Sequence, residues 1–238
     1  RAADVTQDAS VSSALDEVFC ECGRVDQLVC NAGMFLGSTL ESTTMEEFAQ
    51  VFEVNYFGAL RVISAVLPGM RERNKGTIVA VSSQSSEFIL PTWAAYSGSK
   101  SALEASLEAL ALEVGLLGIR VALVQPGSTK TAMREKISPR ENHDSYSTVL
   151  ERYRSIVMAD RQENMIPDEV ARAVEMIFAS DNPPWRTRVG SDAHRNTTMR
   201  HRAGDDEWLR LFRIRGDAEF SLEWSQHRRE FDDSGGSR

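Results

Sequence analysis

Two side chains that could do acid–base chemistry, Tyr96 and Lys100, lie four residues apart in the run AYSGSK (residues 95–100). On a helix, residues i and i+4 share a face, so the phenol would stand beside the ammonium. A nearby positive charge favours the phenolate and lowers the pKa of tyrosine, so Tyr96 could exchange a proton with a carbonyl or alcohol oxygen near neutral pH. Ser83, thirteen residues upstream, could supply a hydroxyl that holds the same oxygen.

A tyrosine and a lysine at this spacing are weak evidence alone, because such pairs arise by chance in many proteins. The surrounding motifs make the pair more informative, because a polar or glycine-containing motif closes each of three apolar runs. These runs are Leu28–Cys30, closed by Asn31-Ala32-Gly33; Thr77–Val81, closed by Ser82-Ser83; and 119–124, closed by Pro126-Gly127 with Thr129 and Thr131 beyond. Asn55 lies in the motif EVNYFG (53–58), and Asp4 and Val5 precede the first helical pattern.

The elements that must position these residues alternate between strand-like and helix-like segments, which is typical of a parallel sheet covered by helices. The predicted helices are 10–22, 44–73, 94–117 and 167–179, and the predicted strands are 25–30, 77–81, 119–124 and 187–190. Gly23 and Gly118 are expected to end helices, Thr43 or Thr44 to cap the second, and Pro68-Gly69 to break or kink its end.

Bulk properties exclude several classes of function. A chain of 238 residues fits one domain, and its net charge of -8 argues against nucleic acid or an anionic membrane as the main partner. No apolar run is expected to reach the roughly 18 residues that a membrane-spanning helix needs. Cys20, Cys22 and Cys30 form no CxxC pair, so we expect reduced, packed thiols and no metal site.

In order and spacing, the motifs resemble the short-chain dehydrogenase/reductase (SDR) family over about residues 1–193, and 31–131 look most like its hydroxysteroid- and retinol-dehydrogenase branch. The resemblance implies a Rossmann-like, doubly wound parallel sheet of the α/β class. It also implies NAD(P)-dependent hydride transfer between a secondary alcohol and a carbonyl. We correspondingly expect a cytoplasmic protein that acts on a small, apolar alcohol or ketone and that forms a homodimer or homotetramer.

By the same resemblance, Tyr96 is the acid/base, and Lys100 lowers the pKa of Tyr96 and hydrogen-bonds the nicotinamide ribose. Ser83 orients the substrate oxygen, and Asn55 holds a water that links Lys100 to solvent. The structural alternatives are a packed tyrosine, a lysine that snorkels, a serine in a turn and an asparagine at a helix kink. Ser82 is the alternative serine, and the thirteen-residue spacing favours Ser83.

The resemblance also assigns cofactor contacts. Residues 31–33 would lie near the adenosine half, Asp4 and Val5 near the adenine ring, and Pro126, Gly127, Thr129 and Thr131 around the nicotinamide carboxamide. Plain strand-ending turns are the alternative at residues 31–33 and 126–131. The branch favours NADP slightly over NAD.

The family normally opens with a strand, a glycine-rich turn and a helix that receives the dinucleotide phosphates, and no such turn is present in this sequence. We therefore expect a sheet that lacks the first βα units, with the strand at 25–30 as an open edge. Two interpretations remain open: a fragment of a full enzyme, or a natural short form that is a non-catalytic binding or regulatory protein. Epimerisation or dehydration on the same scaffold is a third.

The remaining segments are expected to shape substrate binding. Residues 127–166 follow a strand end and are predicted to form a substrate lid within a domain of residues 1–193. Met133, Tyr146, Tyr153 and Met158 could line an apolar pocket or simply pack within the lid, and His143 could touch substrate or lie on the surface. Residues 194–238 are expected to form a charged extension, partly helical, with disorder from Asp232 onward.

Overall fold

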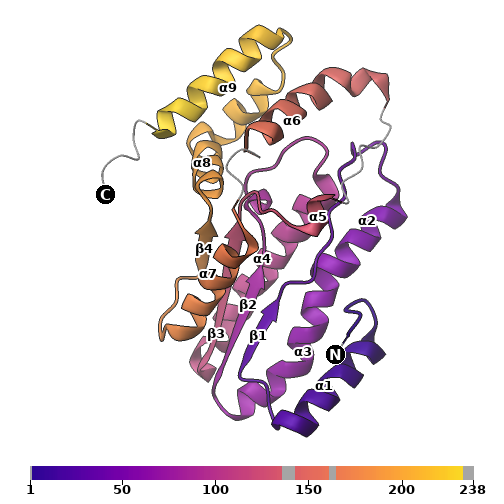
Figure 1. Cartoon of the computed structure of the whole chain (residues 1–238), viewed down its shortest axis with the longest axis vertical. Helices are drawn as coiled ribbons and strands as arrows, with labels where there is room; N and C mark the ends of the chain where they lie inside the picture. The colour runs from indigo at the N-terminus through magenta and orange to yellow at the C-terminus, as the bar shows by residue number, and fades with distance from the viewer. Residues whose placement is uncertain (1, 136–142, 161–164, 233–238) are drawn as a thin grey trace.

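Parallel strands lie side by side in the order β1-β2-β3-β4 at the centre of the fold, in a computed structural model that describes residues 2–135, 143–160 and 165–232 (Figure 1). The strands are β1 (Gln27–Cys30), β2 (Gly76–Val81), β3 (Ile119–Pro126) and β4 (Arg186–Val189). In register, Val29 pairs with Val79, and Val79 pairs with Ala122. The predicted α/β class with a parallel sheet is confirmed. Within the described residues β1 pairs only with β2, so it forms one edge.

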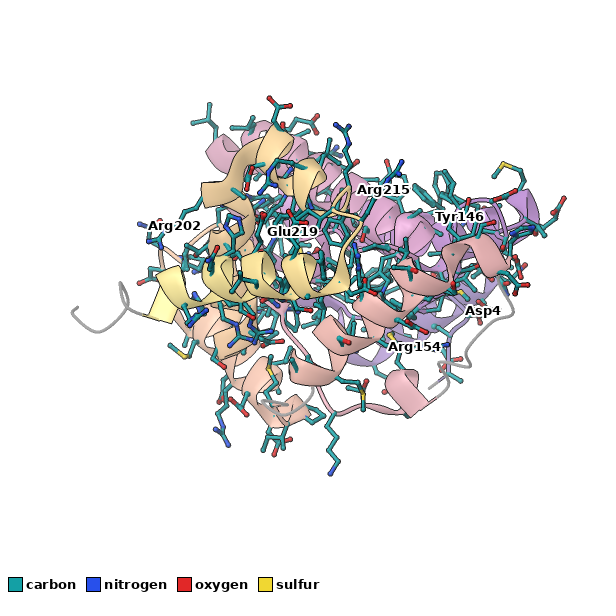
Figure 2. The ribbon with its side chains drawn as sticks, turned by 90° about the horizontal axis from the view of Figure 1, so that it is seen from above. Asp4, Tyr146, Arg154, Arg202, Arg215 and Glu219 are labelled. Atoms are coloured by element: carbon teal, nitrogen blue, oxygen red, sulfur yellow. The ribbon has the colours of Figure 1, made fainter. Side chains whose placement is uncertain are left out.

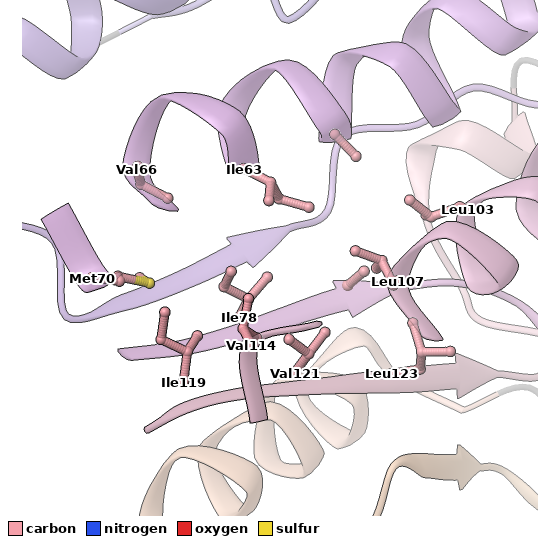
Figure 3. Packing of buried hydrophobic residues seen from close by; sticks show 12 residues of the cluster. Ile63, Val66, Met70, Ile78, Leu103, Leu107, Val114, Ile119, Val121 and Leu123 are labelled. Atoms are coloured by element: carbon pink, nitrogen blue, oxygen red, sulfur yellow. The ribbon is translucent and has the colours of Figure 1, made fainter. Parts of the chain in front are cut away.

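Helices cover both faces of the sheet. The long helices are α1 (Asp8–Cys22), α3 (Gly58–Glu72), α4 (Ala94–Val114) and α7 (Pro167–Ala179). Ile63, Val66 and Met70 of α3 pack with Leu103 and Leu107 of α4 against one face of β2 and β3 (Figure 3). Helix α7 covers the other face, where it contacts Val79, Ala122 and Val124. Alternating side chains of each buried strand therefore serve two apolar layers, as parallel sheets require.

Shorter elements and a carboxyl-terminal helix pair complete the chain. They are α2 (Met45–Phe52), a π-helix η1 (Glu53–Phe57), the 3-10 turns η2 (Gln84–Ser86), η3 (Gly115–Leu117) and η4 (Asp144–Tyr146), and the helices α5 (Ala132–Glu135), α6 (Ser147–Asp160), α8 (Ser191–Leu211) and α9 (Asp217–Asp232). Helices α6, α8 and α9 lie beyond the carboxyl ends of the strands (Figure 1). They are the part of the fold best placed to cover a site there.

Local signals in the sequence explain where most helices begin and end. Thr44 caps α2 through a capping box, in which its hydroxyl accepts from the Glu47 amide at 3.2 Å and the Glu47 carboxylate accepts from the Thr44 amide at 3.0 Å. Gly23 and Gly118 follow helices in the left-handed conformation, with φ of 75° and 67°.

Of the break or kink expected at Pro68-Gly69, the break is wrong. Pro68 lies inside α3, which continues to Glu72. Proline removes one helical hydrogen bond. The buried side chains of Val66 and Met70 on either side of Pro68 hold the last turn of α3 against the sheet.

The helical run Met45–Glu72 is, by length and its mean hydropathy of 1.2, apolar enough to cross a membrane. This differs from the expectation that no run is long enough. A core helix can pass the same test, since it is also largely apolar. Here the run packs over the sheet through Ile63, Val66 and Met70.

The carboxyl-terminal part is helical over more of its length than expected. Helix α8 crosses residue 193, where the family pattern ends, and α9 continues through Asp232, while residues 233–238 lie outside the described residues. Trp208, Leu211, Phe220 and Trp224 are buried in these two helices. The expected packed thiols are also corrected, because Cys20 and Cys22 are exposed on α1 and only Cys30 is partly buried.

Candidate functional site

A cavity of about 620 Å³ opens at the carboxyl ends of β1, β2 and β3. This is the edge of an open parallel sheet at which ligands bind in proteins of this architecture. Its wall combines residues that follow each strand with residues of α4, α6 and α7. From the strand ends come Val29, Asn31, Gly33, Val81, Ser82, Ser83, Gln84, Ser85, Pro126, Gly127, Ser128, Thr129 and Thr131, and from α4 come Tyr96 and Lys100.

Tyr96, Lys100 and Ser83 meet in this cavity. Helix α4 begins at Ala94, so Tyr96 lies in its first turn and Lys100 one turn later on the same side. The Tyr96 hydroxyl is hydrogen-bonded to the side chain of Ser83, which lies just after β2 and caps the turn η2. The Lys100 ammonium lies 6.0 Å from the centroid of the Tyr96 ring. The predicted juxtaposition of the three side chains is therefore present in the structure.

The direction of the Tyr96 pKa differs from expectation. Burial raises the pKa of the Tyr96 phenol, and the hydrogen bond from Ser83 opposes this only in part. Lys100 donates to the Val81 carbonyl at 2.9 Å instead of to the phenol. The predicted lowering of the Tyr96 pKa by Lys100 is therefore absent in this geometry, and the phenol is held protonated at neutral pH.

Lys100 itself is strongly perturbed. Only 4% of the residue is exposed, and burial lowers the pKa of its ammonium from 10.5 to about 8, although the nearby Glu104 and Cys30 pull it upward. A lysine with a pKa of about 8 exchanges protons near neutral pH. Burial raises the pKa of the Cys30 thiol to about 12, so Cys30 stays a neutral neighbour of this site.

Asn55 is positioned by a local irregularity in its helix. The π-helix at Glu53–Phe57 inserts one wider turn between α2 and α3, a feature common at functional sites. The Asn55 side-chain amide donates to the Met34 carbonyl and to the Ser99 hydroxyl, both at 2.9 Å, and its oxygen accepts from the Met34 amide at 2.7 Å. Asn55 thus ties the loop after β1 to α4. Its role in a water relay remains a prediction.

The predicted cofactor contacts fall into two groups. Asn31, Gly33, Pro126, Gly127, Thr129 and Thr131 line the cavity together with Tyr96 and Lys100, and Ala32 lies between two lining residues without being one itself. Asp4 and Val5 lie outside this lining: Asp4 accepts from the Thr6 amide at 2.9 Å, and Val5 packs against Gly58.

Of the residues predicted to lie in the substrate lid, some line the cavity and others do not. Met133 and Tyr153 line the cavity, whereas Tyr146 donates to Glu41 at 2.7 Å and Met158 is exposed. His143 accepts from the Ser145 amide at 3.2 Å and does not line the cavity.

Sequence reasoning missed the aromatic wall of the cavity. The Phe35 ring lies 5.1 Å from that of Tyr96 and 5.6 Å from that of Trp93, measured between centroids. Trp93 also donates from its indole nitrogen to the Tyr153 hydroxyl at 2.9 Å. The position of Trp93, three residues before Tyr96, was the one signal in the sequence that could have indicated its place in the site.

A buried carboxylate, Glu104, was also missed. It accepts from the hydroxyls of Ser82 and Ser86 at 2.5 and 2.6 Å, from Gln125 at 2.9 Å and from Arg186 at 2.8 Å. Glu104 lies one helical turn beyond Lys100, so its spacing could have revealed it. It joins α4 to the residues that follow β2, including the serine next to Ser83.

Comparison with known proteins agrees with this geometry. The model of the short chain dehydrogenase family matches residues 1–142. A 3-ketodihydrosphingosine reductase of Bacteroides thetaiotaomicron is 37% identical over 190 residues, which cover 79% of this chain and 71% of that protein. Retinol dehydrogenase 8 of Bos taurus is 32% identical over 197 residues, which cover 79% of this chain and 62% of that protein.

A solved structure shows the same fold. The short-chain dehydrogenase from Streptomyces avermitilis superposes with a TM-score of 0.75 and 31% identity, covering 90% of this chain and 79% of that one. The matched family model spans more than half of this chain, and the motifs after β1, β2 and β3 lie where the resemblance requires them. The chain therefore belongs to the short-chain dehydrogenase family, whose members are NAD(P)-binding oxidoreductases with a Rossmann-like fold.

Proposed function

We propose that this protein is an NAD(P)-dependent oxidoreductase that interconverts a secondary alcohol and a carbonyl by hydride transfer, with Tyr96 as acid/base. The observation that carries the proposal is the cavity at the strand ends, in which Tyr96 is hydrogen-bonded to Ser83 one helical turn from the buried Lys100. Membership of the short-chain dehydrogenase family supports the same chemistry.

The residues that line the cavity fit the nicotinamide end of a dinucleotide. A Cβ atom on Gly33 would come within 3.3 Å of the Asn55 side-chain oxygen and 3.6 Å of the Lys100 nitrogen, so glycine keeps the space before the ammonium open. Asn31, Gly33, Lys100, Thr129 and Thr131 would hold the cofactor. Bound there, the nicotinamide supplies or accepts the hydride. The family branch favours NADP slightly over NAD.

The chain's own residues would handle the proton and the substrate oxygen. In carbonyl reduction, Ser83 orients the oxygen and Tyr96 gives it the phenolic proton. Because burial raises the pKa of Tyr96, the phenol is protonated at neutral pH, which is the form that reduction needs. Lys100, whose pKa of about 8 lies near neutral pH, can return a proton to the site.

The substrate is proposed to be apolar near the reacting group. Phe35, Leu90, Trp93 and Val157 line the cavity, and among the described lining residues Lys100 is the only charged side chain. An uncharged, apolar ketone would bury its surface against this wall without leaving a charge unpaired. The names of the relatives suggest two first compounds to test. Retinal is an uncharged, apolar aldehyde, and a long-chain 3-keto sphingoid base is an apolar ketone whose amino group tests whether the wall accepts a charge beside the carbonyl.

Replacement of Tyr96 with phenylalanine tests the proposal. Tyr96→Phe is expected to lower kcat by roughly 100-fold to 10,000-fold, the range for loss of a general acid, while NADPH binding persists. The assay follows NADPH and NADH oxidation with the 3-keto sphingoid base and with retinal, and fluorescence titration measures cofactor binding separately.

Tyr56→Phe is the matched control, because Tyr56 also loses a hydroxyl, one hydrogen-bonded to Ser106 at 3.0 Å, and does not line the cavity. Unchanged turnover in Tyr96→Phe would refute Tyr96 as the acid/base. If the native chain binds neither dinucleotide while it is folded, a non-catalytic role on this scaffold would replace the enzyme proposal.

A further inference from the structure

Two faces of helix α6 contact different parts of the molecule. Tyr153 and Val157, one turn apart, line the cavity, whereas Arg152 and Ile156 are buried on the neighbouring face. That second face contacts the helix pair α8 and α9, which we call the carboxyl-terminal hairpin (191–232). Figure 2 shows α6 beside α9, with Arg215 in the turn of the hairpin and Arg154 on α6.

Arg152 is the polar centre of this contact, and 9% of its side chain is exposed. Its guanidinium donates twice to Asp217 at 2.8 and 2.5 Å, to the Ile214 carbonyl at 2.6 Å and to the Arg215 carbonyl at 3.2 Å. It also lies 4.5 Å from the centroid of the Phe220 ring. One side chain of α6 thus satisfies two carbonyls of the turn between α8 and α9, and it pairs with an acidic residue at the start of α9.

An apolar cluster extends the same contact to the cavity wall. Ile156 packs with Trp208, Leu211, Phe220 and Trp224 of the hairpin, and the cluster continues to Phe88 and Leu90 after β2. Leu90 belongs to this cluster and also lines the cavity. The wall near the substrate is therefore continuous with the core of the hairpin.

The other face of α6 reaches the catalytic tyrosine through two aromatic residues. Tyr153 accepts a hydrogen bond from Trp93, and the Trp93 ring lies 6.5 Å from that of Tyr96. A shift of α6 would move Tyr153 and Val157 without moving α4, whose residues Leu103 and Leu107 are anchored in the sheet core. The acid–base residues on α4 and the substrate-binding wall on α6 are therefore held in place by different parts of the fold.

We propose that Arg152 is a positioning residue that fixes α6 to the carboxyl-terminal hairpin and thereby sets the substrate-binding wall formed by Tyr153 and Val157. The inference rests on the proposed oxidoreductase function and assigns its substrate selectivity to a contact outside the cavity. An Arg152→Gln variant retains neither the charge nor the fork of donors that holds the hairpin turn.

The test combines two measurements on the full chain. Hydrogen exchange should show α6 amides exchanging at least tenfold faster in Arg152→Gln, because the buried contact that holds the helix is lost, with α3 and α4 unchanged. In steady-state kinetics, KM for the long-chain 3-keto substrate should rise at least tenfold, and kcat should stay within twofold. Arg154→Gln is the matched control, because Arg154 is exposed on the same helix.

Two results would overturn the inference: unchanged α6 exchange, whatever the KM, or faster exchange with an unchanged KM. Asp217→Asn, which removes the charge but keeps an acceptor oxygen, should give a smaller shift in the same direction, and it decides the matter if Arg152→Gln does not fold. If the native chain turns over no ketone, the oxidoreductase proposal fails. Hydrogen exchange then still tests whether Arg152 holds α6.

Discussion

Replacement of Lys100 with methionine should separate the catalytic value of this lysine from its effect on stability. Lys100 is 4% exposed, and its folded-state pKa of about 8 lies below its ordinary value of 10.5. The folded protein therefore holds this proton less tightly than the unfolded chain does. The resulting loss of stability is fully present below about pH 8 and disappears as the pH rises toward 10.5.

The magnitude follows from that difference in pKa. At about 1.4 kcal/mol for each pH unit, the buried charge costs about 3 kcal/mol of folding free energy at pH 7. Methionine keeps the apolar stem and removes the charge, but it also loses the hydrogen bond from the charged ammonium to the Val81 carbonyl, worth about 2 kcal/mol. Lys100→Met should thus be more stable than the native protein by about 1 kcal/mol at pH 7, and it should have no turnover.

The pH dependence makes the prediction specific. Between pH 7 and pH 9.5 the native protein should regain roughly 2 kcal/mol relative to Lys100→Met, which removes the advantage of the variant. Urea unfolding of both proteins at the two pH values, followed by tryptophan fluorescence, measures it. Burial raises the pKa of Cys30 to about 12, and loss of Lys100 would raise it further. The folded thiol is therefore neutral in both proteins at both pH values, and its titration drops out of the difference.

Lys75→Met is the matched control, because Lys75 is exposed and its removal should change the stability by less than about 0.5 kcal/mol at either pH. A stability gap between Lys100→Met and the native protein that is the same at pH 7 and pH 9.5 would refute the reasoning. So would a less stable Lys100→Met at pH 7. Either result would mean that Lys100 is not held as a buried, weakly protonated ammonium.

Two further substitutions test the frame around the site. Glu104→Gln should lower the free energy of unfolding by roughly 2–3 kcal/mol, because it removes the buried negative charge that pairs with Arg186 and replaces one of its two acceptor oxygens by a donor; Glu108→Gln, exposed one turn further along α4, should be nearly neutral in the same urea titration. Gly127→Ala should cost roughly 1–3 kcal/mol, because the new Cβ would overlap the buried Asp192 carboxylate. Gly115→Ala has no atom within 4 Å and should leave the melting temperature unchanged or raised, so equal losses in both alanine variants would contradict the steric explanation.

Much of the site could be predicted because its residues are fixed by local pattern. Ser83 ends an apolar strand, and Tyr96 and Lys100 share one face of a helix, so chain order and helical period place them together. Hydrophobic periodicity likewise predicted α7 with its proline at the start. These features depend on neighbouring residues and need little knowledge of the tertiary structure.

Other features depend on contacts between distant segments and were not predictable. The π-helix that aims Asn55 adds one residue to a turn, which changes no residue type that the helical period would detect. The Lys100 ammonium turns to the Val81 carbonyl instead of to the Tyr96 phenol. The residue spacing therefore could not show that burial, and not Lys100, decides the direction of the Tyr96 pKa. Packing on the sheet kept α3 intact through Pro68, against its local propensity.

The carboxyl-terminal hairpin is rich in charged residues, and these made its buried apolar residues hard to recognise in the sequence. Trp208 and Leu211 are three residues apart, and Phe220 and Trp224 are four apart, which is the spacing of one buried helical stripe. Frequent acidic and basic residues on the remaining faces gave the segment the appearance of a solvated extension. The spacing of the apolar residues could be recognised in the sequence. The surface of α6 on which they pack could not be predicted, because Ile156 and Arg152 lie more than fifty residues away in the chain.

The two supports of the cavity have different sensitivities to substitution. Helix α4 carries Tyr96 and Lys100 and is held by Leu103, Leu107 and the sheet, so changes there alter chemistry and folding together. Helix α6 contributes only the wall of the cavity and is held by the hairpin. Substitutions at Trp208 or Phe220 should therefore alter which ketone fits, through α6, before they alter proton transfer at Tyr96. A site divided in this way can change its substrate range without rebuilding its acid–base residues.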